Sequence, residues 1–457
     1  MKLEDLKRSI EDKGVKKRIV NNDYRNRETK GYSLDSLKII GITGSVGKST
    51  TAFLIHKYLL SLGKRSILYS SIMVDSPASI ISKDEAFENA CRDEKALLSI
   101  ISEAEKYEAE YLVLEVNEST LEKGILKDVP FAVRVLTNII PAHNLIKYSE
   151  SEYVSIKKLF FSNITDSCKC VLCFQNYSKE LLEELIKINN YPKIICTNKY
   201  IAEKFGIDLN SIDYLLVDCQ NKLDGLFMKI NGKDSVYSLN TNLCMFYNAM
   251  NIMTFFATIN ALELYDEKVL TNVLNKIQIP GRTEIIRANG RIIIIDTHLP
   301  RVLENLKEFK DNGEIKKIKV VIGSVGYGFK TWSEHYKTEK YIQQHHSARK
   351  YAVELLNPVA DYVCFTESDS GAEDTQDICL ELKGYLKKSI ESNIIVDRRD
   401  AIKNTIKDSQ DGDAIFIAGR GNRKILCNGY DSIKLLKDSD IVKDILIEFG
   451  WLKDENL

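Results

Sequence analysis

The stretch Ile39–Leu60 reads IIGITGSVGKSTTAFLIHKYLL and constrains the fold of this chain more than any other. Its β-branched apolar start predicts a strand, its glycines predict a tight loop, and the apolar spacing that follows predicts a helix. Such a loop presents backbone amides at a helix N-terminus, where the helix dipole favours an anion. The stretch therefore predicts a P-loop that binds a polyphosphate.

Two side chains of this loop have expected roles in nucleotide binding. Lys48 is expected to place its charge on the β- and γ-phosphates, and the Ser49 hydroxyl is expected to bind Mg²⁺. The Walker pattern has glycine or alanine where Ile42 stands, so the loop is a variant. This part of the predicted ATP site consists of Gly44, Ser45, Gly47, Lys48, Ser49 and Thr50.

Length, charge and hydropathy limit the number of domains and argue against binding to nucleic acid or a membrane. A chain of 457 residues is too long for one core and predicts two domains. With 64 Lys+Arg against 65 Asp+Glu, the net charge of −1 provides no global field for nucleic acid or an anionic membrane. There is no apolar run long enough for a membrane span, and the charged start lacks the apolar centre of a signal peptide. We therefore expect a cytoplasmic protein.

The cysteines are expected to be thiols in a protein of this size and compartment. Cys168, Cys170 and Cys173 lie close together, but no second Cys/His pair follows at zinc-ligand spacing. The run that contains them is typical of a buried strand. We interpret these cysteines as structural.

Apolar runs alternate with helical stretches along most of the chain, which predicts α/β architecture with mostly parallel sheets. Residues 1–36 are expected to form an N-terminal extension, a helix followed by a polar loop. Residues 37–281 are expected to form the P-loop central domain. From 282 to 457 the pattern restarts with RIIIID and a helix from Leu303, which predicts a smaller, Rossmann-like α/β domain.

Several blocks, in order along the chain, resemble the Mur ligases, and most closely the MurE type. TGSVGKST resembles T-G-T-N-G-K-T-T, and LVLEVNEST resembles M-E-V-S-S-H. TNIIPAHNLIKYSESEYVSIKKLFF matches a further block without a gap, and CMFYNAMN, IPGRTE, IIDTHLP, DYVCFTESDSGAEDTQDI, VDRRDAI and GDAIFIAGRG match later ones. The resemblance covers residues 38 to 425. It implies an ATP-binding central domain and a C-terminal domain that closes over it.

The reaction implied by the resemblance transfers the γ-phosphate of ATP to a carboxylate, and an amine then attacks the acyl phosphate to form an amide. Because this brings anions together, cations must neutralise the approach. Glu115 ends the apolar strand YLVLEV, where a carboxylate beside the loop suits Mg²⁺. The resemblance implies a second ion, with His143 as a ligand and Lys157 as a carbamoylated, catalytic ligand.

Three further residues are assigned to nucleotide binding by the resemblance alone. Asn248 matches an asparagine that contacts the adenine. Arg282 matches the linker arginine, and Asp296 matches a C-domain aspartate near the ribose and phosphates.

This chain departs from the family pattern in three places. Only residues 1–36 precede the P-loop, so we expect no separate N-terminal domain for a UDP-sugar. The diaminopimelate type reads D-N-P-R where this chain has Ser368–Gly371, and the later G-K-G-H-E block appears as GRGNR, with Arg420, Asn422 and Arg423. Ala142 and Ser119 replace an acid and a histidine of the family blocks. We therefore expect an acceptor other than diaminopimelate, one that carries negative charge.

Two functions from different classes are consistent with these residues. The first is an ATP-dependent ligase, MurE-like or close to folylpolyglutamate synthase, that joins a small-molecule carboxylate to an amine or amino acid and acts as a monomer. The alternative is a nucleotide-binding regulatory or partner protein with lapsed ligase activity. The joint presence of Lys48, Ser49, Glu115, His143 and Lys157 favours the ligase.

Overall fold

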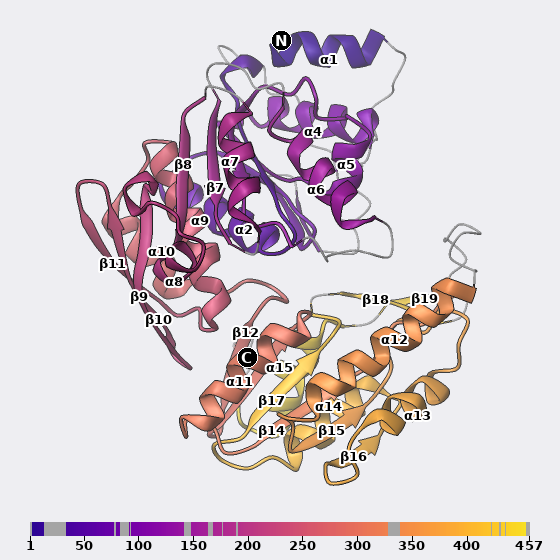
Figure 1. Cartoon of the computed structure of the whole chain (residues 1–457). Helices are drawn as coiled ribbons and strands as arrows, with labels where there is room; N and C mark the ends of the chain where they lie inside the picture. The colour runs from indigo at the N-terminus through magenta and orange to yellow at the C-terminus, as the bar shows by residue number, and fades with distance from the viewer. Residues whose placement is uncertain are drawn as a thin grey trace. The chain divides into compact units, whose positions relative to one another are not determined.

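The computed structural model describes residues 2–12, 33–76, 79–82, 91, 93–140, 148–162, 168–175, 177–188, 191–327, 339–421, 423–428, 431–434 and 436–453. These residues form two compact units, Met1–Ile277 and Gln278–Leu457 (Figure 1). The assignment of 1–36, 37–281 and 282–457 to three separate parts stays a prediction.

The first unit is built on a sheet whose described strands run in the order β11-β10-β9-β8-β7-β6-β1-β5-β2-β3-β4. The strands in the middle of this order, β9-β8-β7-β6-β1-β5-β2, pair in parallel. Antiparallel pairing adds β10 and β11 at one edge and β3 and β4 at the other. Their bounds are β1 Lys38–Thr43, β2 Ser66–Tyr69, β3 Met73–Ser76, β4 Ser79–Ser82, β5 Tyr111–Glu115, β6 Phe131–Leu136, β7 Lys169–Cys173, β8 Lys193–Asn198, β9 Tyr214–Lys222, β10 Gly225–Gly232 and β11 Val236–Thr241.

The order of the central strands fixes the position of the site. β1 lies between β5 and β6, and the chain leaves β1 through α2 (Lys48–Ser61) to reach β2 on the far side of β5. β6 continues the sheet in the other direction, so the strand order reverses at β1. The carboxyl ends of parallel strands at such a switch point are where open α/β sheets bind ligands.

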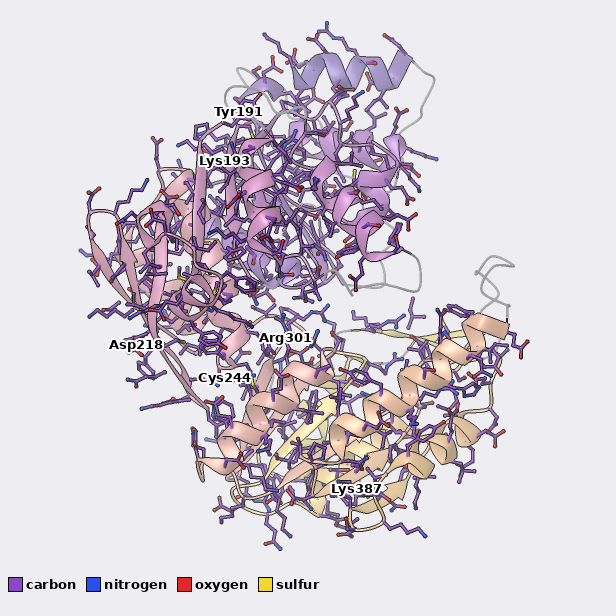
Figure 2. The ribbon with its side chains drawn as sticks, in the orientation of Figure 1. Tyr191, Lys193, Asp218, Cys244, Arg301 and Lys387 are labelled. Atoms are coloured by element: carbon purple, nitrogen blue, oxygen red, sulfur yellow. The ribbon has the colours of Figure 1, made fainter. Side chains whose placement is uncertain are left out.

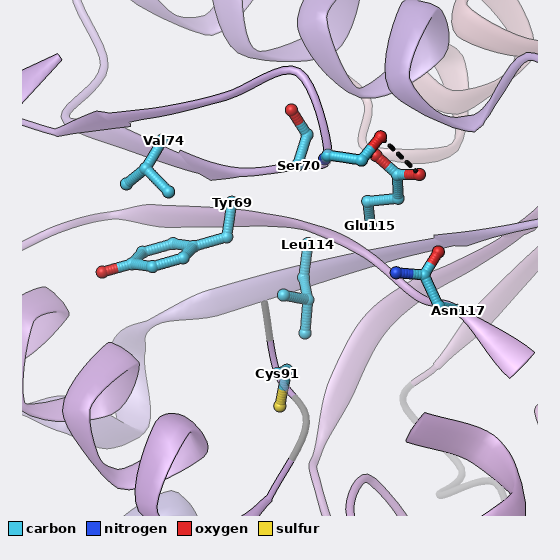
Figure 3. Close-up of a pocket in the computed structure, with 8 residues that line it drawn as sticks. Tyr69, Ser70, Val74, Cys91, Leu114, Glu115 and Asn117 are labelled. Atoms are coloured by element: carbon cyan, nitrogen blue, oxygen red, sulfur yellow. Dashed lines mark hydrogen bonds between the residues drawn. The ribbon is translucent and has the colours of Figure 1, made fainter. Parts of the chain in front are cut away.

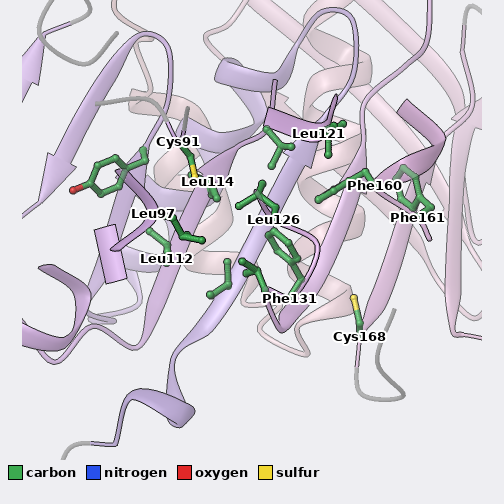
Figure 4. Packing of buried hydrophobic residues seen from close by; sticks show 14 of the residues in the cluster. Cys91, Leu97, Leu112, Leu114, Leu121, Leu126, Phe131, Phe160, Phe161 and Cys168 are labelled. Atoms are coloured by element: carbon green, nitrogen blue, oxygen red, sulfur yellow. The ribbon is translucent and has the colours of Figure 1, made fainter. Parts of the chain in front are cut away.

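The helices of the first unit cover this sheet. α2 is buried around most of its circumference because it contacts α9, α10 and the sheet. On the sheet, a large apolar cluster gathers residues of β1, β5, β6 and α4 (Figure 4). The helices are α1 Leu3–Asp12, α2, α4 Glu94–Lys106, α5 Glu118–Glu122, α6 Glu150–Leu159, α7 Lys179–Lys187, α8 Lys199–Lys204, α9 Phe246–Ala261 and α10 Glu267–Lys276.

The N-terminal helix α1 packs on α4 and is part of the first unit. Its apolar residues Leu3, Leu6 and Ile10 are buried in the same cluster, and Lys7 pairs with Glu105 of α4. The predicted helix in this region is therefore present, and the predicted polar loop after it lies largely outside the described residues.

The second unit has a sheet of order β12-β13-β17-β14-β15-β16, parallel except for the β12–β13 hairpin. Its elements are β12 Glu284–Ala288, β13 Arg291–Asp296, α11 Leu299–Asp311, β14 Ile318–Ile322, α12 Glu339–Leu356, β15 Tyr362–Phe365, α13 Thr375–Tyr385, β16 Glu391–Ile394, α14 Arg398–Lys407, β17 Ala414–Ala418, the hairpin β18 Ile425–Asn428 and β19 Asp431–Lys434, and α15 Asp438–Glu448.

The predicted α/β class with mostly parallel sheets is confirmed. The helix expected from Leu303 begins earlier, at Leu299, because Pro300 occupies the first turn, where a missing amide proton costs nothing. Within the described part of the chain, no helix is both long enough and apolar enough to cross a bilayer.

One buried ion pair joins the starts of α14 and α15. The Arg398 guanidinium binds both carboxylate oxygens of Asp438, at 2.7 and 2.9 Å, and also donates to the carbonyl of Ala418. Both side chains are almost fully buried. Removing either partner would leave an uncompensated charge in the core of this unit.

We therefore predict that Asp438→Ala destabilises the second unit by about 3–5 kcal/mol. The matched control is Asp444→Ala, which removes an exposed partner of Arg399 at 3.6 Å and is expected to cost at most about 1 kcal/mol. Urea denaturation of both variants measures the difference. Equal unfolding midpoints would contradict this role for the buried pair.

Candidate functional site

The P-loop joins β1 to α2, and two of its glycines are required by their surroundings. Gly44 and Gly47 have φ of +146° and +82°. A Cβ atom at Gly44 would lie 2.0 Å from Thr137 Oγ1, and one at Gly47 would lie 2.2 Å from Asn251 Oδ1. Only glycine fits both the backbone conformation and the space. The loop is thus closely packed by β6 on one side and α9 on the other.

Residues after β6 hold the loop in shape. Asn138 accepts a hydrogen bond from Val46 N at 3.1 Å and donates one to Val46 O at 2.9 Å. Thr137 Oγ1 donates to the same carbonyl at 2.6 Å, and Ser45 N donates to Asn138 O at 3.1 Å. These contacts preorganise the loop before any phosphate arrives.

Lys48 is the first residue of α2, and its ammonium folds back over the loop. Its Nζ donates to Gly44 O at 2.8 Å and to Ser45 O at 3.1 Å. The loop therefore combines a helix N-terminus with a cation, the two features that attract a phosphate.

Ser49 and Glu115, the two residues predicted to bind the first Mg²⁺, meet directly. Ser49 Oγ lies 3.0 Å from Glu115 Oε2, which also accepts from Ser71 N at 2.8 Å. Ser71 Oγ donates to the other carboxylate oxygen at 3.2 Å. Ser71 and Glu115 line a small pocket, and Figure 3 shows Glu115 there with Ser70, Leu114 and Asn117.

This set of oxygen donors fits Mg²⁺, a hard cation that binds one or two carboxylates or hydroxyls and completes its shell with water and phosphate. Among the described residues, no three His, Cys, Asp or Glu side chains group together as a metal centre. A cation here would accordingly depend on Ser49, Glu115 and the oxygens of a bound nucleotide.

Lys157, on α6, lies completely buried against the P-loop. Its Nζ lies 2.6 Å from Glu118 Oε1, and it donates to Gly44 O at 2.9 Å and to Thr43 Oγ1 at 3.2 Å. Burial, and then the charge of Lys48, lower the pKa of Lys157 to about 7. Burial raises the pKa of Glu118, but the charges of Lys157 and Lys48 outweigh it and lower that pKa to about 2.

Asn248 lies on α9, one turn before the asparagine that packs on Gly47. Its Nδ2 donates to the carbonyl of Cys244, a residue labelled in Figure 2, and its Oδ1 accepts from Asn251 Nδ2 at 3.0 Å. The side chain is buried. Asn248 is thus linked to the P-loop through Asn251.

Arg282 and Asp296 come together within the second unit. Asp296 ends β13, and its carboxylate accepts from Thr283 N at 2.7 Å and from His298 N at 2.8 Å. Arg282 donates to Thr297 Oγ1 at 2.5 Å. These contacts fold the segment around Arg282 against the end of β13.

The rewritten acceptor blocks also meet within the second unit. Asp369 is buried and accepts from Arg420 Nη1 at 3.2 Å and from Cys427 N at 3.0 Å, and it pairs with Arg423. Arg420 is buried, whereas the side chain of Arg423 is 32% exposed. One aspartate therefore holds two arginines, of which Arg423 reaches solvent.

The structure brings most of the predicted residues of the first unit together, from Gly44 to Thr50 with Glu115 and Lys157. Arg282 and Asp296 adjoin each other in the second unit. His143 lies outside the described residues, as do Ala142 and Asn422. The roles assigned to all these residues stay predictions.

Several site residues were not identified from the sequence. Ser71, Asn138, Asn251 and Glu118 approach the loop from four different segments, so their spacing in the sequence carries no signal for it. Asn138, Asn251 and Glu118 lie inside blocks that the resemblance covers. Glu118, however, stands where the block M-E-V-S-S-H has its second serine, and that substitution was the signal available.

Comparison with known proteins places the chain in a family. Residues 42–259 match the Mur ligase middle domain, and residues 281–421 match the Mur ligase, glutamate ligase domain. The UDP-N-acetylmuramoyl-L-alanyl-D-glutamate–2,6-diaminopimelate ligase of Syntrophomonas wolfei is 24% identical over 92% of this chain and 77% of its own length. The enzyme of the same name from Aquifex aeolicus is 24% identical over 91% and 79%.

Solved structures share the fold. A diaminopimelate ligase of the same name has a TM-score of 0.60 at 20% identity, covering 91% of this chain and 79% of its own. Folylpolyglutamate synthase of Mycobacterium tuberculosis has a TM-score of 0.60 at 17% identity, covering 84% and 88%. The chain belongs to the Mur ligase family of ATP-dependent ligases that form amide bonds.

Proposed function

We propose that this chain activates a small-molecule carboxylate as an acyl phosphate and joins it to an amine at the P-loop of the first unit. The observation that carries this proposal is the direct contact of Ser49 with Glu115 beside Lys48. That contact lies at the carboxyl ends of β1 and β5, adjacent parallel strands. Triphosphate, cation and donor carboxylate would meet there.

In the proposed reaction, a carboxylate oxygen of the donor attacks the γ-phosphorus of ATP and ADP leaves. The amine of the acceptor then attacks the acyl carbon, the amide bond forms, phosphate leaves and the amine loses a proton. Both steps depend mainly on positioning and on stabilising negative charge. An enzyme of this kind releases phosphate only when both organic substrates are present.

The residues around the loop have complementary roles in this proposal. The loop amides and Lys48 hold the triphosphate, and Ser49 and Glu115 hold Mg²⁺. When bound, Mg²⁺ draws negative charge from the phosphate oxygens. Asn138 and Thr137 keep the loop in the conformation that receives the phosphates.

The remaining nucleotide contacts are proposed from the family match. Asn248 would contact the adenine. It accepts a hydrogen bond from Asn251, the residue that packs on the loop. Arg282 and Asp296 of the second unit would bind near the ribose and phosphates. A monomeric state stays a prediction.

Besides His143, a second cation would need an anionic ligand near the loop. Two groups of this chain could supply it. One is the carbamate on Lys157 that the resemblance predicts, which would turn the amine into an anion. The other is Glu118, whose carboxylate already lies against that amine.

We further propose that the acceptor carries an anionic group that binds Arg423. The relatives named above are ligases for 2,6-diaminopimelate, but this chain has Ser368–Gly371 where that type has D-N-P-R. In their place, Asp369 pairs with the Arg423 guanidinium, and the Arg423 side chain as a whole stays 32% exposed. A guanidinium fork suits a carboxylate or phosphate.

The function is tested by incubating the full chain with ATP, Mg²⁺ and a panel of carboxylates and amino acids. ADP and phosphate are expected only when a carboxylate and an amine are both present. Phosphate release that does not depend on the added carboxylate or amine would contradict the proposal, and so would tight ATP binding without turnover. Either result would favour a nucleotide-binding regulatory protein.

We predict that Lys48→Ala and Glu115→Gln each lower the rate of ADP release by about 10²–10³-fold, because each removes one stabilising group from the transferring phosphate. Matched controls are Lys64→Ala and Glu110→Gln, which remove an ion pair at 3.6 Å on the surface of the same unit. Full activity of Lys48→Ala or Glu115→Gln in a coupled ADP assay would refute the site assignment.

For the acceptor, we predict that Arg423→Gln raises the KM for an anionic acceptor by about tenfold or more, the equivalent of one charged hydrogen bond of about 1.5–3 kcal/mol. The control is Lys387→Gln, an exposed lysine of the same unit labelled in Figure 2. An unchanged KM and an unchanged order of preference among acceptors would contradict an anion subsite at Arg423.

A further inference from the structure

A buried arginine joins three segments of the second unit. Arg349 lies on α12, and its side chain is only 1% exposed. Its guanidinium donates to both carboxylate oxygens of Glu373, with 2.9 Å between Nη1 and Oε1. It also donates to Glu381 Oε2 at 2.6 Å and to the carbonyl of Val325 at 3.3 Å. Because the fork binds both oxygens of Glu373, it fixes the direction of that carboxylate, which a lysine ammonium could not do.

The two glutamates that bind Arg349 have different surroundings. Glu381 lies on α13, which packs beside α12 (Figure 1), and its carboxylate also lies 2.8 Å from His346 Nδ1 on α12. Its contacts hold the two helices together. Glu373 precedes α13, and its Oε2 also accepts from Tyr327 N at 3.2 Å. Of the two, Glu373 therefore connects Arg349 to the backbone that follows β14.

That backbone pairs with the loop Ser368–Glu373, which lies between β15 and α13. Gly326 N donates to Asp369 O at 2.7 Å, and Ala372 N donates to Tyr327 O at 2.7 Å. A Cβ atom at Gly326 would lie 1.8 Å from a carbonyl oxygen of the loop, so the two backbones are in close contact there. The loop thus takes its conformation from the segment after β14.

The same loop carries the aspartate that pairs with Arg423. Asp369 is buried, and its carboxylate binds Arg420 and Arg423 as well as the amide of Cys427. Arg423 is the residue proposed to bind the anionic group of the acceptor, so its position depends on the loop. A misplacement of about 1 Å in a binding group can lower a rate by about 10²-fold.

We propose that Arg349 is a positioning residue for the acceptor. Through Glu373 it fixes the loop Ser368–Glu373, and the loop holds Asp369 and Arg423 in the arrangement that binds an anionic amine. This inference rests on the proposed function, because it needs an acceptor at Arg423. Since the P-loop belongs to the first unit, a change at Arg349 is expected to weaken acceptor binding and to leave ATP binding as it is.

The first test compares Glu373→Gln with Glu381→Gln, because each removes one carboxylate that binds Arg349 but only Glu373 also binds Tyr327 N. The assay uses ATP and the carboxylate–amine pair that gives turnover in the panel. Glu373→Gln, and Arg349→Lys, which keeps the charge without the fork, are each expected to raise the KM for the amine by about five- to tenfold, with kcat and the KM for ATP changed less than about twofold. Glu381→Gln is expected to leave all three constants within about twofold.

Two results of this assay would overturn the proposal. One is an unchanged KM for the amine in both Glu373→Gln and Arg349→Lys. The other is an equal rise in Glu381→Gln, which would indicate a general loosening of α12 against α13. The matched surface control is Lys350→Ala, which removes the exposed neighbour of Arg349 that pairs with Glu354 at 3.9 Å.

The second test needs no substrate and follows hydrogen exchange of the full chain by mass spectrometry. Glu373→Gln is expected to speed the exchange of the Gly326 and Ala372 amides by at least about tenfold, because their hydrogen bonds then open more often. Gly326→Ala, which forces the two backbones apart without changing a charge, is expected to do the same at Ala372. Exchange at the wild-type rate in Glu373→Gln would overturn the proposal.

The outcomes separate this inference from the proposed function. If no carboxylate–amine pair gives turnover, the proposed function fails and this inference fails with it. If a pair gives turnover and Arg423→Gln raises the KM for the amine, but Glu373→Gln and Arg349→Lys do not, only the role of Arg349 fails.

Discussion

The site depends on one constraint, the position of β1 between β5 and β6 in a parallel sheet. This order places the P-loop, Glu115 and the Thr137–Asn138 pair at the same edge. The loop then packs so closely that two of its positions accept only glycine. Its shape is set by hydrogen bonds from Thr137 and Asn138, just after β6, and its charge is set by residues of α2, β5, α5 and α6.

Charge balance at the loop explains the arrangement of its ionisable groups. Lys48 and Lys157 bring positive charge to a place where a triphosphate and a carboxylate would meet. Glu115 and Glu118 bring negative charge, each hydrogen-bonded from the protein. A site of this kind is close to neutral before its ligands bind, and this limits the free-energy cost of burying Lys157. A nucleotide with Mg²⁺ can then bind without leaving a large uncompensated charge.

Much of this could be predicted from the sequence because its signals are local. The loop between a strand and a helix, the parallel strands and the position of Glu115 at a strand end all follow from contiguous residues, and the family match confirms the ligase class. The partners of Lys157 could not be predicted in this way. Glu118 and Tyr153 lie on two different helices, and only the folded structure brings them to Lys157 and the P-loop. Asp369 and Arg423 likewise meet through tertiary structure.

The most direct measurement is a crystal structure of the full chain with AMPPCP and Mg²⁺. The account predicts the γ-phosphate against Lys48 Nζ and the loop amides, with an ion about 2.0–2.1 Å from Ser49 Oγ and a phosphate oxygen, and Glu115 in the shell of that ion. A nucleotide bound elsewhere, or a γ-phosphate remote from Lys48 and Glu115, would contradict it.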